Sequence, residues 1–463
     1  MENIQNWLNS NRERFEKDLF SLLSLASIGT DPAYDEQVHA TGKWILDFFE
    51  GIDFSTRWIE TCGHPIVFAQ SPPVEGAPTV LVYGHYDVQP PDPVELWETP
   101  PFEPSVRNGN VYARGATDDK GQMMTHLFSC EAWMKNGGSL PVNVKFLIEG
   151  EEESGSSGLK ELLAGKYDDA LGMTVKELLD ADIAVISDTS QYGPGKPAIT
   201  YGLRGIYYWE LRLKGPKADL HSGNFGGSVS NPANALTHML NALIDEKGRI
   251  QLPGFYDGIV EMSEKEKQQL ADLNFDDDAY REELGVDALH GEEGYSTLQR
   301  RWSRPTFDIN GLWSGYQGEG AKTVLPAEAG AKFSFRLVPG QELATVKSGL
   351  EQILKDNCPP GIEMELIDMH GAPGCVVSMD NPFLGCAAKA IEKGFGVAPV
   401  FTRSGGSIPV VLYLNELLGI DTLLLGWGQD DDNLHSPNEK FSLDDFFKGT
   451  CSSAWLWQEM AAK

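Results

Sequence analysis

The sequence predicts an α/β protein whose main domain, a mixed sheet flanked by helices, is interrupted by a smaller ferredoxin-like α+β domain. Strand and helix patterns alternate from Thr79 to Asp188, and the alternation resumes at Asn381. Between them, from Gly202, strand-like segments lie on either side of helical ones. We therefore expect one domain built from residues 1–201 and 379–463, and a second one built from residues 202–378.

The main domain is expected to hold several buried strands. Each is a run of β-branched, aliphatic and aromatic residues that ends in a glycine or a polar residue, the pattern of a strand covered on both faces. These runs are 79–84, 142–148, 183–187 and 422–427. The chain then ends in a helix that begins near Leu443.

The inserted domain shows a different order of elements. A strand is predicted at 206–213 and a helix near Asn231-Pro232, because proline suits the first turn of a helix. An acidic stretch at 258–284 is predicted to be a helical insertion in this domain. The pattern continues with a strand at 329–338, a helix at 342–356 and a strand at 362–369.

Polar residues gather where the predicted strands of the main domain end. His85 and Asp87 are two residues apart and so share a face, as alternate strand residues do. Carboxylates or a histidine follow at the remaining turns and strand ends: Asp118 and Asp119, Glu151 to Glu153, Asp188, and His435.

Each of these groups alone also fits a structural role. A buried histidine can bond to a nearby aspartate, aspartates favour helix N-termini, and a glutamate run is usually a solvated loop. Together they give a mixed nitrogen and oxygen ligand set without a thiolate. This set suits one or two Zn²⁺ ions in a catalytic site, with Mn²⁺ or Co²⁺ as alternatives.

Composition excludes several partners. The 463 residues carry a formal net charge of −31, which argues against binding to nucleic acid or to an anionic membrane. The six cysteines form no C-x-x-C pair, and we expect them to be reduced and to serve mostly in packing. We find no secretory leader and no stretch apolar enough to span a membrane, so the expected location is the cytoplasm.

Ordered motifs along most of the chain resemble the M20 metallopeptidases, and within them the carnosinase-like, cytosolic non-specific dipeptidases. The motifs are YGHYDVQP (83–90), ARGATDDKGQ (113–122), EGEEESGS (149–156), ITYGLRGIYY (199–208), DLHSGNFGGSV (219–229), KTVLPAEAGAKFSFRLVP (322–339), RSGGSIPV (403–410) and HSPNE (435–439). The resemblance implies a zinc-peptidase-like catalytic domain in residues 1–201 and 379–463. It also implies that residues 202–378 form a lid and dimerisation domain.

The resemblance also implies a centre with two Zn²⁺ ions per subunit. His85 and Asp188 would bind one ion, and Glu153 and His435 would bind the other. The Asp118 carboxylate would bridge the two ions, and the peptide bond between Asp118 and Asp119 would be cis. In addition, Asp87 would support His85, and Glu152 would be the general base acting on a metal-activated bridging water. If the glutamate register slips by one residue, the base would be Glu151.

Further residues are implied in catalysis and substrate binding. His221 would complete the active site of the partner subunit in a homodimer as a catalytic residue that donates to the tetrahedral oxyanion. Arg336 would bind the substrate's terminal carboxylate. The other expected substrate contacts are His370, Ser407, Thr323 and Gly406. The implied reaction is hydrolysis of dipeptides or short peptides with a free C-terminal carboxylate. N-acyl amino acid amidohydrolysis and a non-catalytic peptide-binding role are the alternatives.

Overall fold

The computed structural model describes all residues from Met1 to Lys463, which fold into two compact units. The first unit contains residues 1–201, 377–402 and 413–463, and the second contains residues 202–376 and 403–412. The mixed α/β class predicted from the sequence is confirmed. The assignment of these units as catalytic domain and lid stays a prediction.

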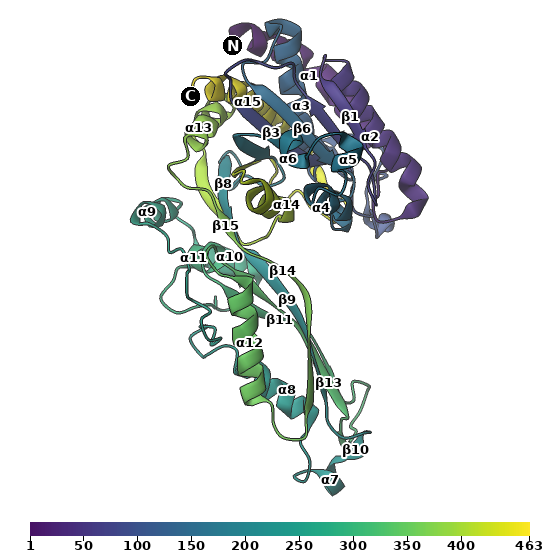
Figure 1. The fold of residues 1–463 in the computed structure, drawn as a ribbon, viewed down its shortest axis with the longest axis vertical. Coiled ribbons are helices and arrows are strands. Elements are labelled where there is room, and N and C mark those ends of the chain that lie inside the picture. The colour runs from purple at the N-terminus through teal and green to yellow at the C-terminus, as the bar shows by residue number, and fades with distance from the viewer. The chain divides into compact units, whose positions relative to one another are not determined.

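The first unit is built on a long mixed sheet in the strand order β1-β2-β6-β3-β7-β17-β8, with β16 also paired to β8. Figure 1 labels β1, β3, β6 and β8 of this sheet. Strand β3 runs parallel to β6 and β7, and β17 runs parallel to β7. The strand bounds are β1 Ser55–Ile59, β2 Ile66–Gln70, β3 Thr79–His85, β6 Asn143–Glu149, β7 Ile183–Ile186, β8 Ala198–Leu203, β16 Val400–Ser404 and β17 Thr422–Gly426. The four strands predicted for this domain are therefore present.

Helices cover this sheet and pack on one another through aromatic residues. Phe15 of α1 stacks on Phe128 of α3 with ring centroids 4.2 Å apart, and both side chains are fully buried. The helix bounds are α1 Glu2–Leu23, α2 Asp35–Glu50, α3 Lys120–Gly137, α4 Ser157–Leu163, α5 Asp168–Leu171, α6 Val175–Leu179, α13 Pro382–Phe395 and α15 Leu443–Ala461, whereas nearly all of α14 Pro409–Tyr413 belongs to the second unit. A small separate sheet contains β4 Ser105–Arg107, β5 Asn110–Tyr112 and β18 Lys440–Ser442.

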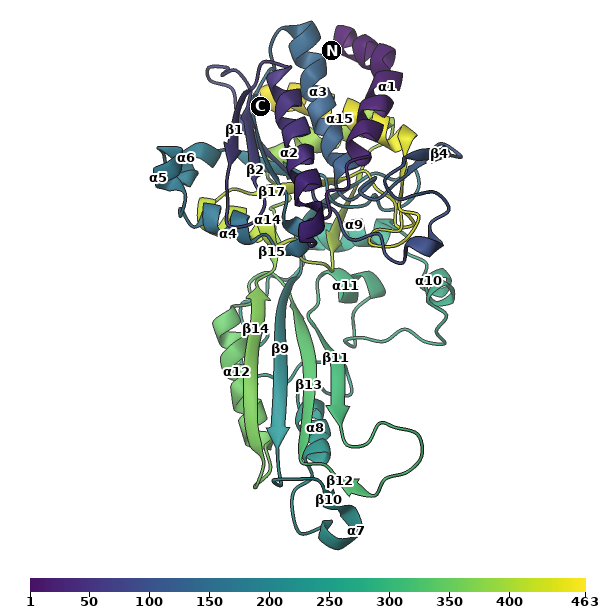
Figure 2. The ribbon, with the colours of Figure 1, turned by 90° about the vertical axis from the view of Figure 1, so that its right-hand side faces the viewer.

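The second unit holds an antiparallel four-stranded sheet in the order β11-β13-β9-β14, whose strands lie side by side in Figure 2. Side chains such as Leu211, Phe333 and Phe335 alternate onto one face and form a core with α8 and α12. The bounds of these elements are β9 Gly205–Lys214, α8 Pro232–Asn241, β11 Thr306–Ser314, β13 Glu328–Leu337, α12 Leu343–Asn357 and β14 Glu363–Ala372. The short elements are β10 Leu220–His221, α7 Ser222–Phe225, β12 Val324–Leu325 and β15 Cys375–Val376.

The acidic stretch predicted as a helical insertion forms α9 Glu264–Asp272 and α10 Asp277–Leu284, followed by α11 Thr297–Trp302. Its residue Glu266 is paired with Arg403, which is buried. Arg204 in addition donates to the Gly405 carbonyl at 3.1 Å. These contacts explain why residues 403–412 pack with the second unit, although the sequence analysis placed them in the last part of the main domain.

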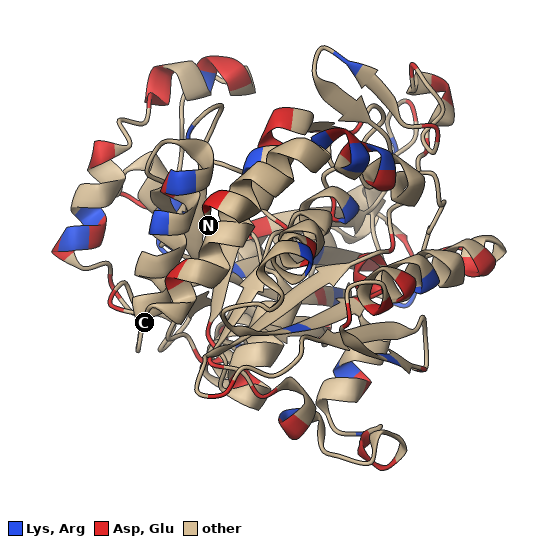
Figure 3. Cartoon of the chain, turned by 90° about the horizontal axis from the view of Figure 1, so that it is seen from above, with Lys and Arg blue, Asp and Glu red and all other residues tan.

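Acidic residues are distributed over many helices and loops rather than gathered in one region, as Figure 3 shows in red. None of the helices combines the length and the apolar character that a membrane crossing needs.

Candidate metal centre

The residues predicted as metal ligands all belong to the first unit and lie in loops that follow or connect its strands. His85 is the last residue of β3, Asp188 lies just beyond β7, and His435 follows β17. Glu153 lies in the short helix η3 (Glu152–Ser154) after β6, and Asp118 precedes α3. Because parallel strands end at the same edge of a sheet, these loops meet in space.

The five residues form two groups that share Asp118. His85, Asp118 and Asp188 have ligand atoms within 4.8 Å of one another, and so do Asp118, Glu153 and His435. The Nε2 atom of His85 lies 3.1 Å from one oxygen of Asp118, and the Nε2 atom of His435 lies 2.9 Å from the other. His435 Nε2 also lies 3.3 Å from Glu153 Oε1. A carboxylate that belongs to both groups is able to bridge two metal ions.

The donor set fits divalent metal ions. The Nε2 atom of His85 is buried and has no hydrogen-bond partner of suitable geometry, so it is available as a ligand atom. Nitrogen and oxygen donors without sulfur are typical of catalytic zinc sites, which keep a position open for water or substrate. The residues present are thus able to hold metal ions at both groups.

Electrostatics in the centre favour positive charge. The contacts of Asp118 and Glu153 raise the pKa of His435 to about 10. Burial raises the pKa of Asp188, and the neighbouring Asp118 raises it further. Burial also tends to lower the pKa of His85, but its contacts with Asp118 and Asp87 outweigh burial and the pKa is raised. A cation among these groups would lower the cost of burying the carboxylates.

Asp87 supports the centre in a way that the sequence did not predict. His85 Nδ1 lies 3.1 Å from the Asp87 backbone carbonyl, whereas the Asp87 carboxylate is 3.5 Å away. That carboxylate also accepts the backbone N–H groups of Glu152 at 3.1 Å and of Glu153 at 3.0 Å. Asp87 therefore links the segment of His85 to the glutamate loop.

The glutamate run divides into residues with different surroundings. The Glu151 carboxylate accepts the Gly158 N–H at 2.9 Å and fills the space beside Gly63, where a Cβ would come within 2.3 Å of it. Glu153 lies among the candidate ligands. Burial raises the pKa of Glu152, His85 opposes this shift, and Glu153 adds to it. Glu151 is thus engaged away from the candidate ligands, whereas Glu153 belongs to one of the two ligand groups.

Two features of the centre concern residues around Asp118. The bond between Asp118 and Asp119 is cis, as the resemblance implied. Glu439, whose role the sequence analysis left open, accepts the N–H of Asp118 at 3.1 Å and is fully buried. Its place in the HSPNE motif was a signal in the sequence, but its partner lies 321 residues away.

The predicted substrate-binding residues all lie in the second unit, where the structure separates them into two clusters. Arg336 donates to Ser407 at 3.3 Å, and the Gly406 N–H donates to Ser404 nearby along the chain. His370 of β14 stacks on Tyr208 of β9 with ring centroids 5.5 Å apart, and Tyr208 lies two residues from Ile206, the partner of Arg336 in the sheet. Arg336, Ser407, Gly406 and His370 thus lie toward the same end of the sheet.

His221 and Thr323 form the other cluster. His221 pairs with Val324 in the small sheet of β10 and β12, and Ser222 donates to the Thr323 carbonyl at 3.1 Å. Glu328 is the first residue of β13, and Arg336 lies eight positions further along this strand. At roughly 3.4 Å per residue, the two positions are about 27 Å apart. Figure 2 shows β10 and β12 beyond the far end of the sheet. Within one unit, His221 and Arg336 therefore cannot contact the same small molecule.

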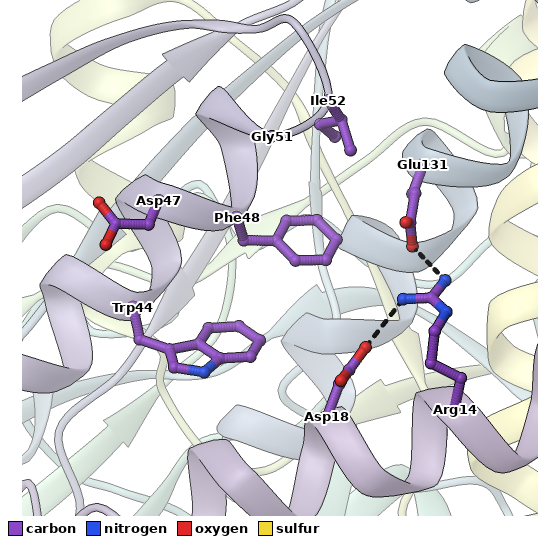
Figure 4. Close-up of a pocket in the computed structure, with 8 residues that line it drawn as sticks. All are labelled: Arg14, Asp18, Trp44, Asp47, Phe48, Gly51, Ile52 and Glu131. Carbon is purple, nitrogen blue, oxygen red and sulfur yellow. Dashed lines mark hydrogen bonds and ion pairs between the residues drawn. The ribbon is translucent and has the colours of Figure 1, made fainter.

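A hollow of about 340 Å³ lies between α1, α2 and α3 and contains none of the candidate metal ligands (Figure 4). Arg14 is paired there with Asp18 at 2.8 Å and with Glu131 at 2.6 Å. Asp47 is paired with Lys43 at 3.2 Å. Each charged side chain that lines this hollow is thus already engaged in an ion pair.

Comparison with known proteins gives a consistent picture. A family model described as Peptidase family M20/M25/M40 matches residues 81–458. Cys-Gly metallodipeptidase dug1 of Schizosaccharomyces pombe is 33% identical over 97% of this chain and 96% of its own length. Beta-Ala-His dipeptidase of Homo sapiens is 34% identical over 86% of this chain and 78% of its own length. The M20 metallo-carboxypeptidase Sso-CP2 of Sulfolobus solfataricus has a similar structure, with a TM-score of 0.82 and 31% identity over 97% of this chain and 99% of its own. The resemblance inferred from the motifs is thus confirmed.

The shared position of Asp118 generates a prediction about metal content. We expect Asp118→Asn to weaken metal binding at both groups, because the amide oxygen is uncharged and the nitrogen cannot be a ligand. Asp188→Asn should weaken binding at one group only, since Asp188 belongs to one. Elemental analysis and calorimetric titration with Zn²⁺ would measure this, with Glu151→Gln as a matched control. Equal metal loss in the Asp118 and Asp188 variants would contradict the shared ligand.

Proposed function

The chain belongs to peptidase family M20/M25/M40, and from this premise we propose that it is a dinuclear metallopeptidase that hydrolyses dipeptides or short peptides with a free C-terminal carboxylate. The observation that carries the proposal is the pair of ligand groups that share Asp118. Two relatives of similar length, named for Cys-Gly and Beta-Ala-His, act on dipeptides and support the substrate class. The proposed location is the cytoplasm, which suits a chain whose six cysteines include no C-x-x-C pair.

The proposed cofactor is a pair of Zn²⁺ ions per subunit, with Mn²⁺ or Co²⁺ as alternatives. His85, Asp118 and Asp188 would hold one ion, and Asp118, Glu153 and His435 the other. When bound, such a pair supplies an acidified water and polarises the scissile carbonyl.

Glu152 is proposed as the general base. Burial raises its pKa, as suits a carboxylate that accepts a proton and later releases it. Its carboxylate would take a proton from the attacking water and later give it to the amine that leaves. The new C–O bond and the broken C–N bond then yield a carboxylic acid and an amine.

Arg336 is proposed to bind the C-terminal carboxylate of the substrate. The guanidinium donates to the hydroxyl of Ser407 at 3.3 Å and forms no ion pair with a carboxylate, so most of its N–H groups are available. A planar guanidinium can donate two parallel hydrogen bonds to a carboxylate. His370 and Gly406, at the same end of the sheet, are proposed to line this position.

His221 and Thr323 are proposed to serve the centre of a second copy of the chain. Their distance along the sheet from Arg336 supports this arrangement, because one small substrate cannot reach both ends. A homodimer with two-fold symmetry would give each centre a histidine from its partner. His221 is exposed, and its Nδ1 accepts the Gly223 N–H at 3.1 Å, which leaves Nε2 as the donor for the oxyanion.

The function is tested with a substrate panel on the Zn²⁺-, Mn²⁺- or Co²⁺-loaded chain. We expect free dipeptides to be hydrolysed and C-amidated dipeptides to lose about 2–5 kcal/mol in kcat/KM, because the amide cannot pair with Arg336. Arg336→Met should reduce turnover of the free dipeptide to that of the amidated one, whereas Arg212→Met, an exposed arginine on the same sheet, should have little effect.

The same panel distinguishes the alternatives. Preference for N-acyl amino acids over dipeptides would support amidohydrolysis, and preference for long peptides would favour a carboxypeptidase. Binding without turnover would identify a non-catalytic member. Activity that survives complete removal of metal by EDTA, or equal turnover of free and amidated dipeptides, would refute the proposal.

A second prediction concerns the general base. Glu152→Gln should keep its fold and metal but lose roughly 10²–10⁴-fold in kcat, the usual contribution of a general base. Glu151→Gln is the matched control and should remain active, since Glu151 bonds to the Gly158 N–H. Steady-state kinetics and metal analysis of both variants would check this. If Glu151→Gln is the inactive one with full metal content, the register is wrong by one residue.

A third prediction concerns the composite site. His221→Ala and Glu152→Gln should each be inactive as homodimers. If His221 acts on the partner's centre, a mixed dimer has one centre with both defects and one with neither, and regains up to about half of the wild-type activity. Subunit exchange can be followed with differently tagged chains. Exchange without recovered activity, or a fully active monomer, would exclude the composite site.

A further inference from the structure

A single buried carboxylate, that of Glu439, accepts four hydrogen bonds. One oxygen accepts the N–H groups of Thr117 at 3.0 Å and Asp118 at 3.1 Å. The other accepts the Gly115 N–H at 2.9 Å and the Arg114 guanidinium at 2.8 Å. Glu439 is 0% exposed and Arg114 is 1% exposed. All four donors come from the segment that carries Asp118.

These bonds connect three segments that carry candidate ligands. Glu439 lies four residues after His435, and its backbone carbonyl accepts the Ala113 N–H at 3.1 Å. Arg114 also donates to the Pro90 carbonyl at 3.2 Å, in the segment that follows His85. The Glu439 and Arg114 pair is thus the point where the loops of His85, Asp118 and His435 are joined.

The loops joined at this point contain residues with a positive φ. His435 has a φ of 58°, which is uncommon for a residue with a side chain and persists only where its surroundings determine it. Gly115 has a φ of 82°, and a Cβ there would lie 2.8 Å from Val88. Without Glu439, the N–H groups of residues 115, 117 and 118 would lose their buried acceptor.

We propose that Glu439 is a positioning residue that fixes the orientation of the Asp118 carboxylate and thereby sets the affinity of the centre for metal ions. Asp118 has one oxygen toward His85 and the other toward His435, so a small rotation of its backbone would disturb both groups. The bond from the Asp118 N–H to Glu439 opposes that rotation. This inference rests on the proposed metal centre.

The test compares Glu439→Gln with wild type in calorimetric titrations of metal-stripped chain with Zn²⁺. The side chains have the same shape, but the amide nitrogen of glutamine cannot accept N–H groups. We expect the fold to be retained and metal affinity to fall about 10–100-fold, the usual effect of losing a group that orients a ligand. With saturating Co²⁺, the visible spectrum should change, and kcat should fall more than KM changes.

Glu292→Gln is the matched control. Glu292 is also buried and paired with an arginine, Arg304 at 2.7 Å, but it belongs to the second unit. It should reduce stability without changing metal affinity or the Co²⁺ spectrum. If Glu439→Gln does not fold, Glu439→Asp keeps the charge and withdraws the oxygens by one methylene, and the same loss of affinity is expected.

The outcomes separate this inference from the proposed function. A wild-type chain that binds no metal would overturn both. A wild-type chain that binds metal, beside a Glu439→Gln chain of equal affinity and unchanged spectrum, would overturn only the role of Glu439. Failure of both Glu439 variants to fold would also overturn it, because the residue would then act on the fold as a whole.

Discussion

Two histidine nitrogens face the two oxygens of one carboxylate, that of Asp118, at 3.1 and 2.9 Å. This arrangement constrains the first unit, because the three residues lie in segments that are far apart in the sequence. The segments of His85 and His435 come together because β3, β7 and β17 run in parallel and end at the same edge of the sheet. The parallel order of these strands therefore serves the centre as well as the hydrophobic core.

Local sequence patterns predict much of this arrangement. The buried strands are visible as apolar runs, and the candidate ligands follow because they stand directly after those runs. The hydrogen bonds that join the loops are not visible in the same way. Glu439 and Asp118 are separated by 321 residues, and no periodicity relates them. The Asp87 carboxylate lies 3.5 Å from Nδ1 of His85, which it was expected to support. The N–H groups of Glu152 and Glu153 that it also accepts come from another strand end and were not predicted.

The second unit was harder to predict for a related reason. The strands β9, β13 and β14 and the two packed helices follow from alternation and helical periodicity, but strand β11 and the boundary at residues 403–412 were not predicted. That segment is held by a buried ion pair with Glu266 of the acidic insertion and by the bonds of Arg204. Ser407 in the same segment receives a bond from Arg336. The stretch that the sequence predicted only as an acidic helical insertion thus anchors residues beside the proposed carboxylate site.

The geometry of the second unit bears on the number of chains that the reaction needs. Strand β13 is paired along its length on both edges, so it separates the Arg336 cluster from the His221 cluster as a rigid spacer. A peptide bond and the terminal carboxylate of a dipeptide are only a few ångströms apart, far less than the roughly 27 Å spanned by eight strand residues. If both clusters contribute to catalysis, they serve different substrate molecules. A closed two-fold assembly is the simplest arrangement in which every cluster has a centre to serve.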